Sequence, residues 1–157
     1  CLVPRDPSGP RAPLMPGSFC DRLLLEYIDG RTWDVVHGFT YDLGYKGSNE
    51  RVVIPFGFLT DFASIPRVLW SLFPPTGKYG KAAVIHDWLY RHRTVRTISL
   101  DTGAVLSIRL VTKREADAIF GEAMSVLGVG RFTRWSLRTG LAVGGWVAWN
   151  RYRREEE

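Results

Sequence analysis

The sequence predicts an α+β fold with an N-terminal antiparallel sheet, a central helix, a second β-hairpin and two C-terminal helices. Runs of β-branched and aromatic residues, separated by turn residues, fill the chain from residue 21 to residue 58. Helical apolar patterns follow residue 77 and return after residue 112. With 45% hydrophobic residues in a chain of 157, the sequence can bury the core of one domain.

Both ends of the chain are expected to lie outside this domain. Residues 1–19 carry a proline at every third position from Pro4 to Pro16, which favours an extended arm and excludes a helix or a central strand. We expect the arm to contact a neighbouring chain or a groove, because it has almost no apolar periodicity of its own. The predicted domain spans 20–152, and 153–157 form a charged tail.

Four strand-like runs predict the N-terminal sheet. The first two flank Asp29 and Gly30, a dipeptide typical of a type I′ hairpin turn. The next two flank the turn-rich segment 46–50. Short runs joined in this way favour antiparallel pairing.

The segment 57–80 is neither a clean strand nor a clean helix. Asp61 lies between bulky apolar residues, and a buried carboxylate must be paired, so Asp61 is either a structural hydrogen-bond hub or part of a site. A short helix is predicted at 66–73, with Pro66 in its first turn and Ser64 as a candidate cap.

The helix predicted at 77–93 carries three side chains that could form a functional site. His86 and Tyr90 lie one turn apart on a shared face, and Asp87 points to an adjoining face. Histidine changes its charge near neutral pH, and a neighbouring carboxylate can hold a metal or orient an imidazole. These three residues therefore form the first candidate site.

The second hairpin and the next helix follow directly. Two alternating runs about the turn 101–103 predict the hairpin. Thr112 and Glu115 form a T-x-x-E capping box that opens a helix at 113–128, which its last glycine ends.

Asp117 lies at the edge of the apolar stripe of that helix. We expect it within hydrogen-bonding reach of His86 or Tyr90, because a polar network on the first helix needs a carboxylate partner. The alternative is an ordinary solvated carboxylate.

The last helical segment resembles a membrane anchor only at first sight. Its uncharged core, 139–150, falls well short of the roughly twenty residues that span a bilayer. We therefore expect a packed helix, in which Gly140 and Gly144 let another element approach closely. Trp146 and Trp149 are expected to be buried or to seek an interface.

The net charge of +5 favours anionic surfaces, among them lipid headgroups, although such an excess also serves plain solubility. No motif predicts sequence-specific nucleic-acid binding. The segment 131–138 interleaves arginine with aromatic residues, which suits either base stacking or a solvated helix face.

Two sequence blocks, TDFASIPR at 60–67 and HDWLY at 86–90, resemble an uncharacterised domain family common in tailed bacteriophages and prophages. The resemblance extends over residues 21–149. It implies a phage or prophage origin, other virion or phage proteins as partners, and a location in the virion or the host cytoplasm. It brings no established activity.

A second resemblance implies a catalytic activity. The pattern HD-x-x-Y on one helix, followed by AD on a later helix, is similar to phospholipase A2, particularly the short viral type without disulfides. This similarity implies that His86 activates water, that Asp117 orients the imidazole and that Tyr90 hydrogen-bonds to Asp117. It also implies a calcium ion held by Asp87. Asp61, as a possible part of the site, is a second candidate metal ligand. Of the glycine-rich calcium loop of phospholipases, only PPTGKYG stands close by.

Two function classes follow. The first is a phage-type accessory or virion and tail-associated structural protein, in which Asp61, His86, Asp87 and Asp117 form a buried polar network that fixes the fold. The alternative is a metal-dependent hydrolase, specifically a calcium-dependent, phospholipase-like esterase that uses the His-Asp site.

Two further hydrolase arrangements stay open. His37 could join His86 and the aspartates in the H…HD…D order of metal-dependent phosphohydrolases. A triad of Ser64, His86 and an aspartate is the other arrangement, although Ser64 lacks the context of a nucleophile elbow.

Overall fold

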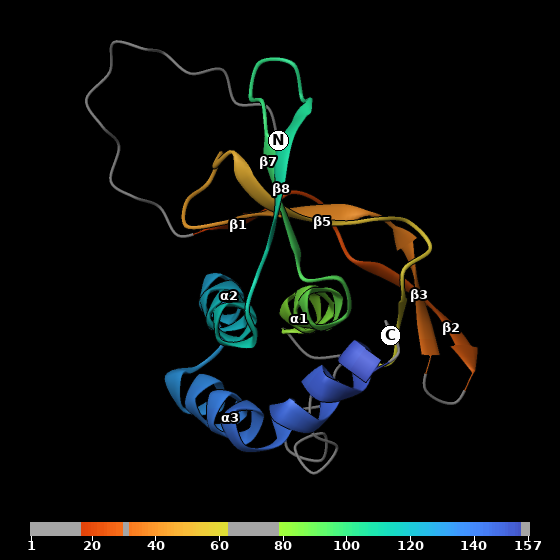
Figure 1. Ribbon diagram of the computed structural model, residues 1–157, viewed down its shortest axis with the longest axis vertical. Coiled ribbons are helices and arrows are strands. Elements are labelled where there is room, and N and C mark those ends of the chain that lie inside the picture. Colours follow the sequence, from red (N-terminus) through yellow and green to blue (C-terminus); the bar gives the residue numbers. More distant parts are fainter. Residues whose placement is uncertain (1–16, 30–31, 63–78, 155–157) are drawn as a thin grey trace.

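The computed structural model describes residues 17–29, 32–62 and 79–154, and it has the predicted α+β fold (Figure 1). The predicted helix at 66–73 and most of the proline-rich arm lie outside the described residues. The elements, in chain order, are β1 (Ser18–Phe19), β2 (Leu24–Asp29), β3 (Thr32–His37), β4 (Phe39–Asp42), β5 (Glu50–Ile54), β6 (Leu59–Thr60), α1 (Gly80–His92), β7 (Thr94–Ile98), β8 (Val105–Leu110), α2 (Lys113–Val126) and α3 (Arg131–Arg154).

The described strands form two antiparallel sheets, and the helices cover one side of the larger sheet. The larger sheet has the order β1-β4-β5-β7-β8, and the smaller has the order β2-β3-β6. Figure 1 shows α1 and α2 side by side below the larger sheet, with α3 crossing on their far side. The core fills the space between these layers; its fully buried side chains include Tyr41, Val52, Ile54, Ile85, Leu89, Phe120, Met124, Leu137 and Leu141.

The strands are grouped differently from the expectation of one N-terminal sheet and a separate hairpin. The expected β2–β3 hairpin is present, but it pairs with β6 in a sheet of its own. The β7–β8 hairpin instead extends the sheet of β4 and β5, through the pair Arg51 and Arg96. The chain passes between the two sheets at Gly38, where an added Cβ would lie 2.9 Å from the carbonyl oxygen of Ile54.

The domain begins earlier than the predicted boundary at residue 20. Ser18 and Phe19 pair with Asp42 and Tyr41 as the edge strand β1. The Phe19 ring lies 4.7 Å from the ring of Tyr41, so the end of the predicted arm contributes to the core.

Helix α1 is the central element of the fold. Its side chains are buried without interruption from Ala82 to Tyr90, because the sheet, α2 and α3 surround it. Burial on all sides explains its nearly continuous apolar sequence. The helix ends at Arg93, which adopts a left-handed conformation with φ of 56°, and β7 begins one residue later.

The predicted start of α2 is confirmed, and its last residue, Val126, comes two residues before the predicted end at 128. The Thr112 hydroxyl accepts the backbone N–H of Glu115 at 3.3 Å, which satisfies one of the free donors of the first turn. Gly128, with φ of 69°, follows the last turn and reverses the chain direction.

Helix α3 packs along one face only. Leu137, Leu141 and Trp149 are buried, whereas Trp135 and Val147 are 65% and 77% exposed. Within residues 17–29, 32–62 and 79–154, no helix is both long and apolar enough to cross a membrane.

Gly145, next to the predicted contact glycine Gly144, lets α3 approach α1 and α2 closely. A Cβ at Gly145 would lie 2.7 Å from the Tyr90 hydroxyl and 3.1 Å from Lys113 Nζ. The distance to the Tyr90 hydroxyl is too short for carbon and the distance to Lys113 is tight, so a side chain here would displace the hydroxyl and press against the lysine.

We predict that Gly145→Ala destabilises the protein. Overpacking costs about 1–3 kcal/mol, which exceeds the gain of up to about 1 kcal/mol in helix propensity. Urea denaturation measures the difference, and Gly130→Ala is the matched control because nothing lies within 4 Å of its Cβ position. A Gly145→Ala variant as stable as its parent would contradict this packing.

Candidate functional site

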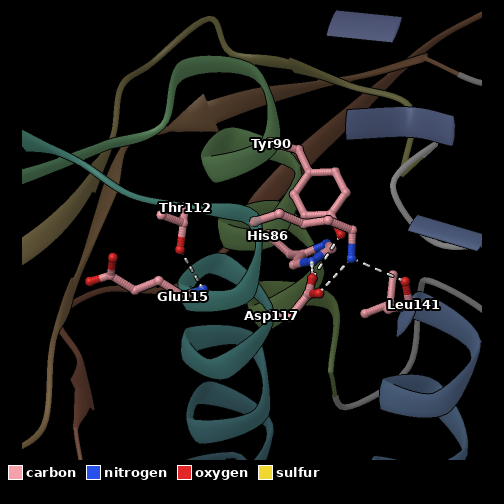
Figure 2. Close-up of polar contacts among 7 residues, drawn as sticks. His86, Tyr90, Thr112, Glu115, Asp117 and Leu141 are labelled. Atoms are coloured by element: carbon pink, nitrogen blue, oxygen red, sulfur yellow. Dashed lines mark hydrogen bonds and ion pairs between the residues drawn. The ribbon is translucent and has the colours of Figure 1, made fainter. Parts of the chain in front are cut away.

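Three polar side chains from α1 and α2 meet at one carboxylate, that of Asp117 on α2 (Figure 2). His86 Nε2 lies 2.9 Å from Asp117 Oδ1, and the Tyr90 hydroxyl donates to the same oxygen at 2.7 Å. Lys113 Nζ donates to Asp117 Oδ2 at 2.7 Å and to the carbonyl oxygen of Leu141 on α3 at 3.2 Å. The predicted contact of Asp117 with His86 or Tyr90 is confirmed with both.

Helical spacing places these groups. His86 and Tyr90 lie four residues apart on α1, and Lys113 and Asp117 lie four residues apart on α2. Two such pairs on neighbouring helices bring the donors of α1 and the lysine of α2 to one acceptor. We call His86, Tyr90, Lys113 and Asp117 the Asp117 network.

The protonation states follow from the surroundings. Burial lowers the pKa of His86 below its ordinary 6.5, despite the opposing hydrogen bond and charge of Asp117. Burial alone would raise the pKa of Asp117, but the hydrogen bonds from His86, Lys113 and Tyr90 lower it overall. The imidazole is therefore neutral and the carboxylate ionised at pH 7. Because a carboxylate only accepts, Nε2 carries the imidazole proton.

This tautomer leaves Nδ1 of His86 as a bare acceptor. Nδ1 is buried and has no hydrogen-bond partner among the described residues. The His86 ring lies 4.1 Å from the Tyr90 ring and 4.7 Å from the Phe120 ring, measured between centroids. The His86 side chain has no exposed surface, whereas the Asp117 side chain is 20% exposed.

A pocket of about 540 Å³ opens above the network and reaches Asp117 but does not include His86. It lies between the first turn of α2, the end of α1 and the second half of α3. Its lining combines cations with two indole rings: Arg93, Thr112, Lys113, Arg114, Asp117, Ala142, Trp146 and Trp149.

Asp87 and Asp61, the predicted metal ligands, meet at an arginine. Asp87 Oδ2 accepts the Thr60 hydroxyl at 2.7 Å and lies 3.3 Å from an Arg91 guanidinium nitrogen. The same nitrogen donates to Asp61 at 2.6 Å, and another donates to the carbonyl oxygen of Leu59 at 2.8 Å. We call Thr60, Asp61, Asp87 and Arg91 the Arg91 cluster.

The Arg91 cluster does not fit a calcium ion. Calcium takes six to eight oxygen ligands, whereas these two carboxylates already share a guanidinium cation. No group of three or more candidate metal ligands occurs in the part of the chain that the structure describes.

Of the other two candidate residues, His37 lies in the described part of the chain and is not brought to the site. His37 is exposed at the end of β3 and makes no hydrogen bond or ion pair with His86, Asp87 or Asp117. Ser64 lies outside the described residues.

Sequence reasoning missed Thr60, Arg91 and Lys113. For the two cations a signal was present, because Asp87 with Arg91 and Lys113 with Asp117 both have the four-residue spacing of helical ion pairs.

The chain matches the model of a known protein family. The family model described as a protein of unknown function (DUF1353) matches residues 33–140. This range contains both polar clusters but ends before Leu141 and the two tryptophans of the pocket. No curated protein and no solved structure matches the chain.

The Arg91 cluster predicts a specific pH dependence. Burial raises the pKa of Asp87 from 3.8 to about 6, although Arg91 and Thr60 act in the opposite direction. The folded state therefore holds this proton more tightly than the unfolded state, and the associated stability is lost as pH rises through about 6. We expect Asp87→Asn to gain up to about 3 kcal/mol relative to the parent between pH 4 and pH 7.5.

Chemical denaturation at several pH values tests this expectation. Thr60→Val is the matched comparison, because it removes a hydrogen bond that lowers the Asp87 pKa and should extend the pH dependence to higher pH. A stability difference between Asp87→Asn and the parent that stays constant with pH would contradict the assignment.

Proposed function

Because the chain belongs to the DUF1353 family of proteins of unknown function, we propose a function from its own chemistry: a phage-type accessory or virion protein whose His-Asp groups are structural. The observation that carries this proposal is the complete burial of the His86 imidazole. Neither ring nitrogen reaches the pocket, since Nε2 is bonded to Asp117 and Nδ1 is buried.

The Asp117 network suits a structural role because it joins three helices. One carboxylate accepts from two side chains of α1 and one of α2, and the lysine of α2 continues to a backbone carbonyl of α3. Removing one partner leaves the others buried without a hydrogen-bond partner. The loss of folding free energy is about 1–3 kcal/mol for a neutral group and more for a charge.

The phage-type assignment is supported by the two sequence blocks that carry the resemblance. The described part of the first block, Thr60 to Phe62, is bonded directly to the helix that carries the second. Thr60 and Asp61 contact Asp87 and Arg91, so the blocks form one junction between β6 and α1. A structural junction of this kind accounts for Thr60, Asp61, Asp87 and Arg91 without a catalytic role.

A second candidate, a hydrolase, is favoured by the bare Nδ1 atom of His86. With Nε2–H donated to Asp117 and Tyr90 on the same carboxylate, the imidazole is oriented as a general base would be. A water at Nδ1 would give up its proton there, its oxygen would bond to an ester carbonyl carbon, and the alcohol would leave with the proton. This chemistry requires an opening to Nδ1.

We predict that His86 and Asp117 are coupled in stability. His86→Ala and Asp117→Ala should each destabilise the fold, and the double variant should show a coupling of about 0.5–3 kcal/mol. His37→Ala is the matched control, since His37 is exposed and a surface change stays within about 0.5 kcal/mol. Denaturation curves of the four proteins and the control give these values.

Hydrolysis of a short-chain phospholipid ester, with and without calcium, separates the two candidates. The structural proposal expects no hydrolysis by the parent above the rate of His86→Gln. If the parent hydrolyses the ester and His86→Gln folds normally but is inactive, the hydrolase is the function and the structural proposal fails.

A further inference from the structure

We propose that the pocket beside Asp117 binds a nucleotide-type ligand, that is, a phosphate group attached to a planar ring. The proposal concerns the open side of the network and does not depend on whether His86 is catalytic. It rests on the charges, the free donors and the indole rings that line this pocket.

The charges favour an anion. Arg93, Lys113 and Arg114 supply three positive charges against one negative charge from Asp117. Asp117 is already satisfied by three donors, which limits its repulsion of a ligand. Arg114 is exposed and has no ion pair among the described residues, and Arg93 uses only Nε, on the carbonyl oxygen of Val111.

The first turn of α2 also favours an anion in the pocket. Thr112 caps the N–H of Glu115, while the N–H groups of Lys113 and Arg114 have no acceptor within the helix. Two arginine side chains and these donors can surround a phosphate, whose oxygens arginine binds in pairs.

The indole rings provide the second half of the site. Trp146 is 56% exposed, and Lys113 Nζ lies 5.6 Å from its ring centre. Trp149 is nearly buried beneath the Arg93 guanidinium at 5.7 Å. An indole held against cations, with one side open, is a stacking surface for a planar ring. The pocket volume of about 540 Å³ lies in the range of small-molecule sites.

Tryptophan fluorescence and calorimetry with adenosine monophosphate, adenosine, inorganic phosphate and dihexanoyl phosphatidic acid test the proposal. We expect adenosine monophosphate to bind at least tenfold more tightly than each of the others. Arg114→Gln and Trp146→Ala should each weaken this binding at least fivefold. The matched controls Arg131→Gln and Trp135→Ala, which change exposed residues of α3 outside the pocket, should stay within twofold.

Three results would overturn the proposal. The first is no saturable binding of adenosine monophosphate. The second is equal affinity for phosphatidic acid, which would show that the ring is not recognised. The third is an equal loss of affinity in the controls.

A different observation carries a second proposal: we infer that β8 pairs with β8 of a second copy of the chain. β8 is the last strand of the larger sheet, so one of its sides has no strand partner among residues 17–29, 32–62 and 79–154. Figure 1 shows the β7–β8 hairpin projecting away from the helices. An unpaired edge of this kind is a template for another strand.

The backbone of β8 is oriented for such pairing. Val111 donates its N–H to Arg93, and Val95 is opposite Arg109, so the odd positions bond to β7. Because the directions alternate in an antiparallel ladder, Ile108 and Leu110 direct their N–H and C=O groups to the open edge.

The side chains are self-complementary about Ile108. Leu106, Ile108 and Leu110 are 65%, 58% and 63% exposed. An antiparallel pair centred on Ile108 places Ile108 opposite its copy and Leu106 opposite Leu110 of the second chain. Charged side chains on an edge strand disfavour pairing with another strand. The guanidinium of Arg109 is instead bonded to Glu50 and Glu115 of the same chain.

Sedimentation equilibrium tests this pairing over a range of protein concentrations. We expect a monomer–dimer equilibrium that Ile108→Lys weakens at least tenfold without changing the circular dichroism. Phe132→Lys, at a 74% exposed position on α3, is the matched control and should leave the equilibrium unchanged. A monomeric parent, or a dimer insensitive to Ile108→Lys but abolished by removing residues 1–16, would overturn the inference.

Discussion

The hydrogen bonding of one carboxylate, that of Asp117, determines how the helical layer is assembled. It accepts three donors from two helices, and one of those donors also reaches the third helix. Each donor is buried or nearly so, and each would be costly to leave unpaired. The three helices therefore have one mutual arrangement that satisfies all of these groups. Close approach at Gly145 is part of the same constraint, because a larger residue would push Tyr90 and Lys113 away from the carboxylate.

The Arg91 cluster plays a comparable part on the other side of α1. Its guanidinium joins α1 to the end of the smaller sheet, through Asp61 and the carbonyl oxygen of Leu59. Asp87 is fully buried beside it, and one of its oxygens, Oδ1, has no hydrogen-bond partner among the described residues. Helix α1 is therefore held by polar contacts on two faces and by apolar contacts on the others. This explains how a helix with a His-Asp pair in its middle can occupy the centre of the core.

Local sequence signals predicted the elements and five of the eight residues in the two polar clusters, all but Thr60, Arg91 and Lys113. The capping box of Thr112 and Glu115 and the four-residue spacing of His86 and Tyr90 each act over about one turn, so they can be recognised without knowledge of the fold. Asp117 was recognised from its place at the edge of the apolar stripe of its own helix. The partition of the strands between two sheets depends on pairings such as Arg51 with Arg96, which are far apart in the chain. Arg91 was missed because an arginine at the end of a helix usually faces solvent. Its two carboxylate partners come together only after β6 packs beside α1.

Arg93 has two roles, one in the turn after α1 and one in the wall of the pocket. Its left-handed conformation allows β7 to begin directly after α1, and it is a conformation that glycine adopts more readily than arginine. Its guanidinium meanwhile lies over Trp149 in the wall of the pocket. Protein engineering at this position therefore faces two opposed goals. A glycine would relax the turn but remove a positive charge and an indole contact, so directed evolution for a less strained turn would also change the charge of the pocket wall.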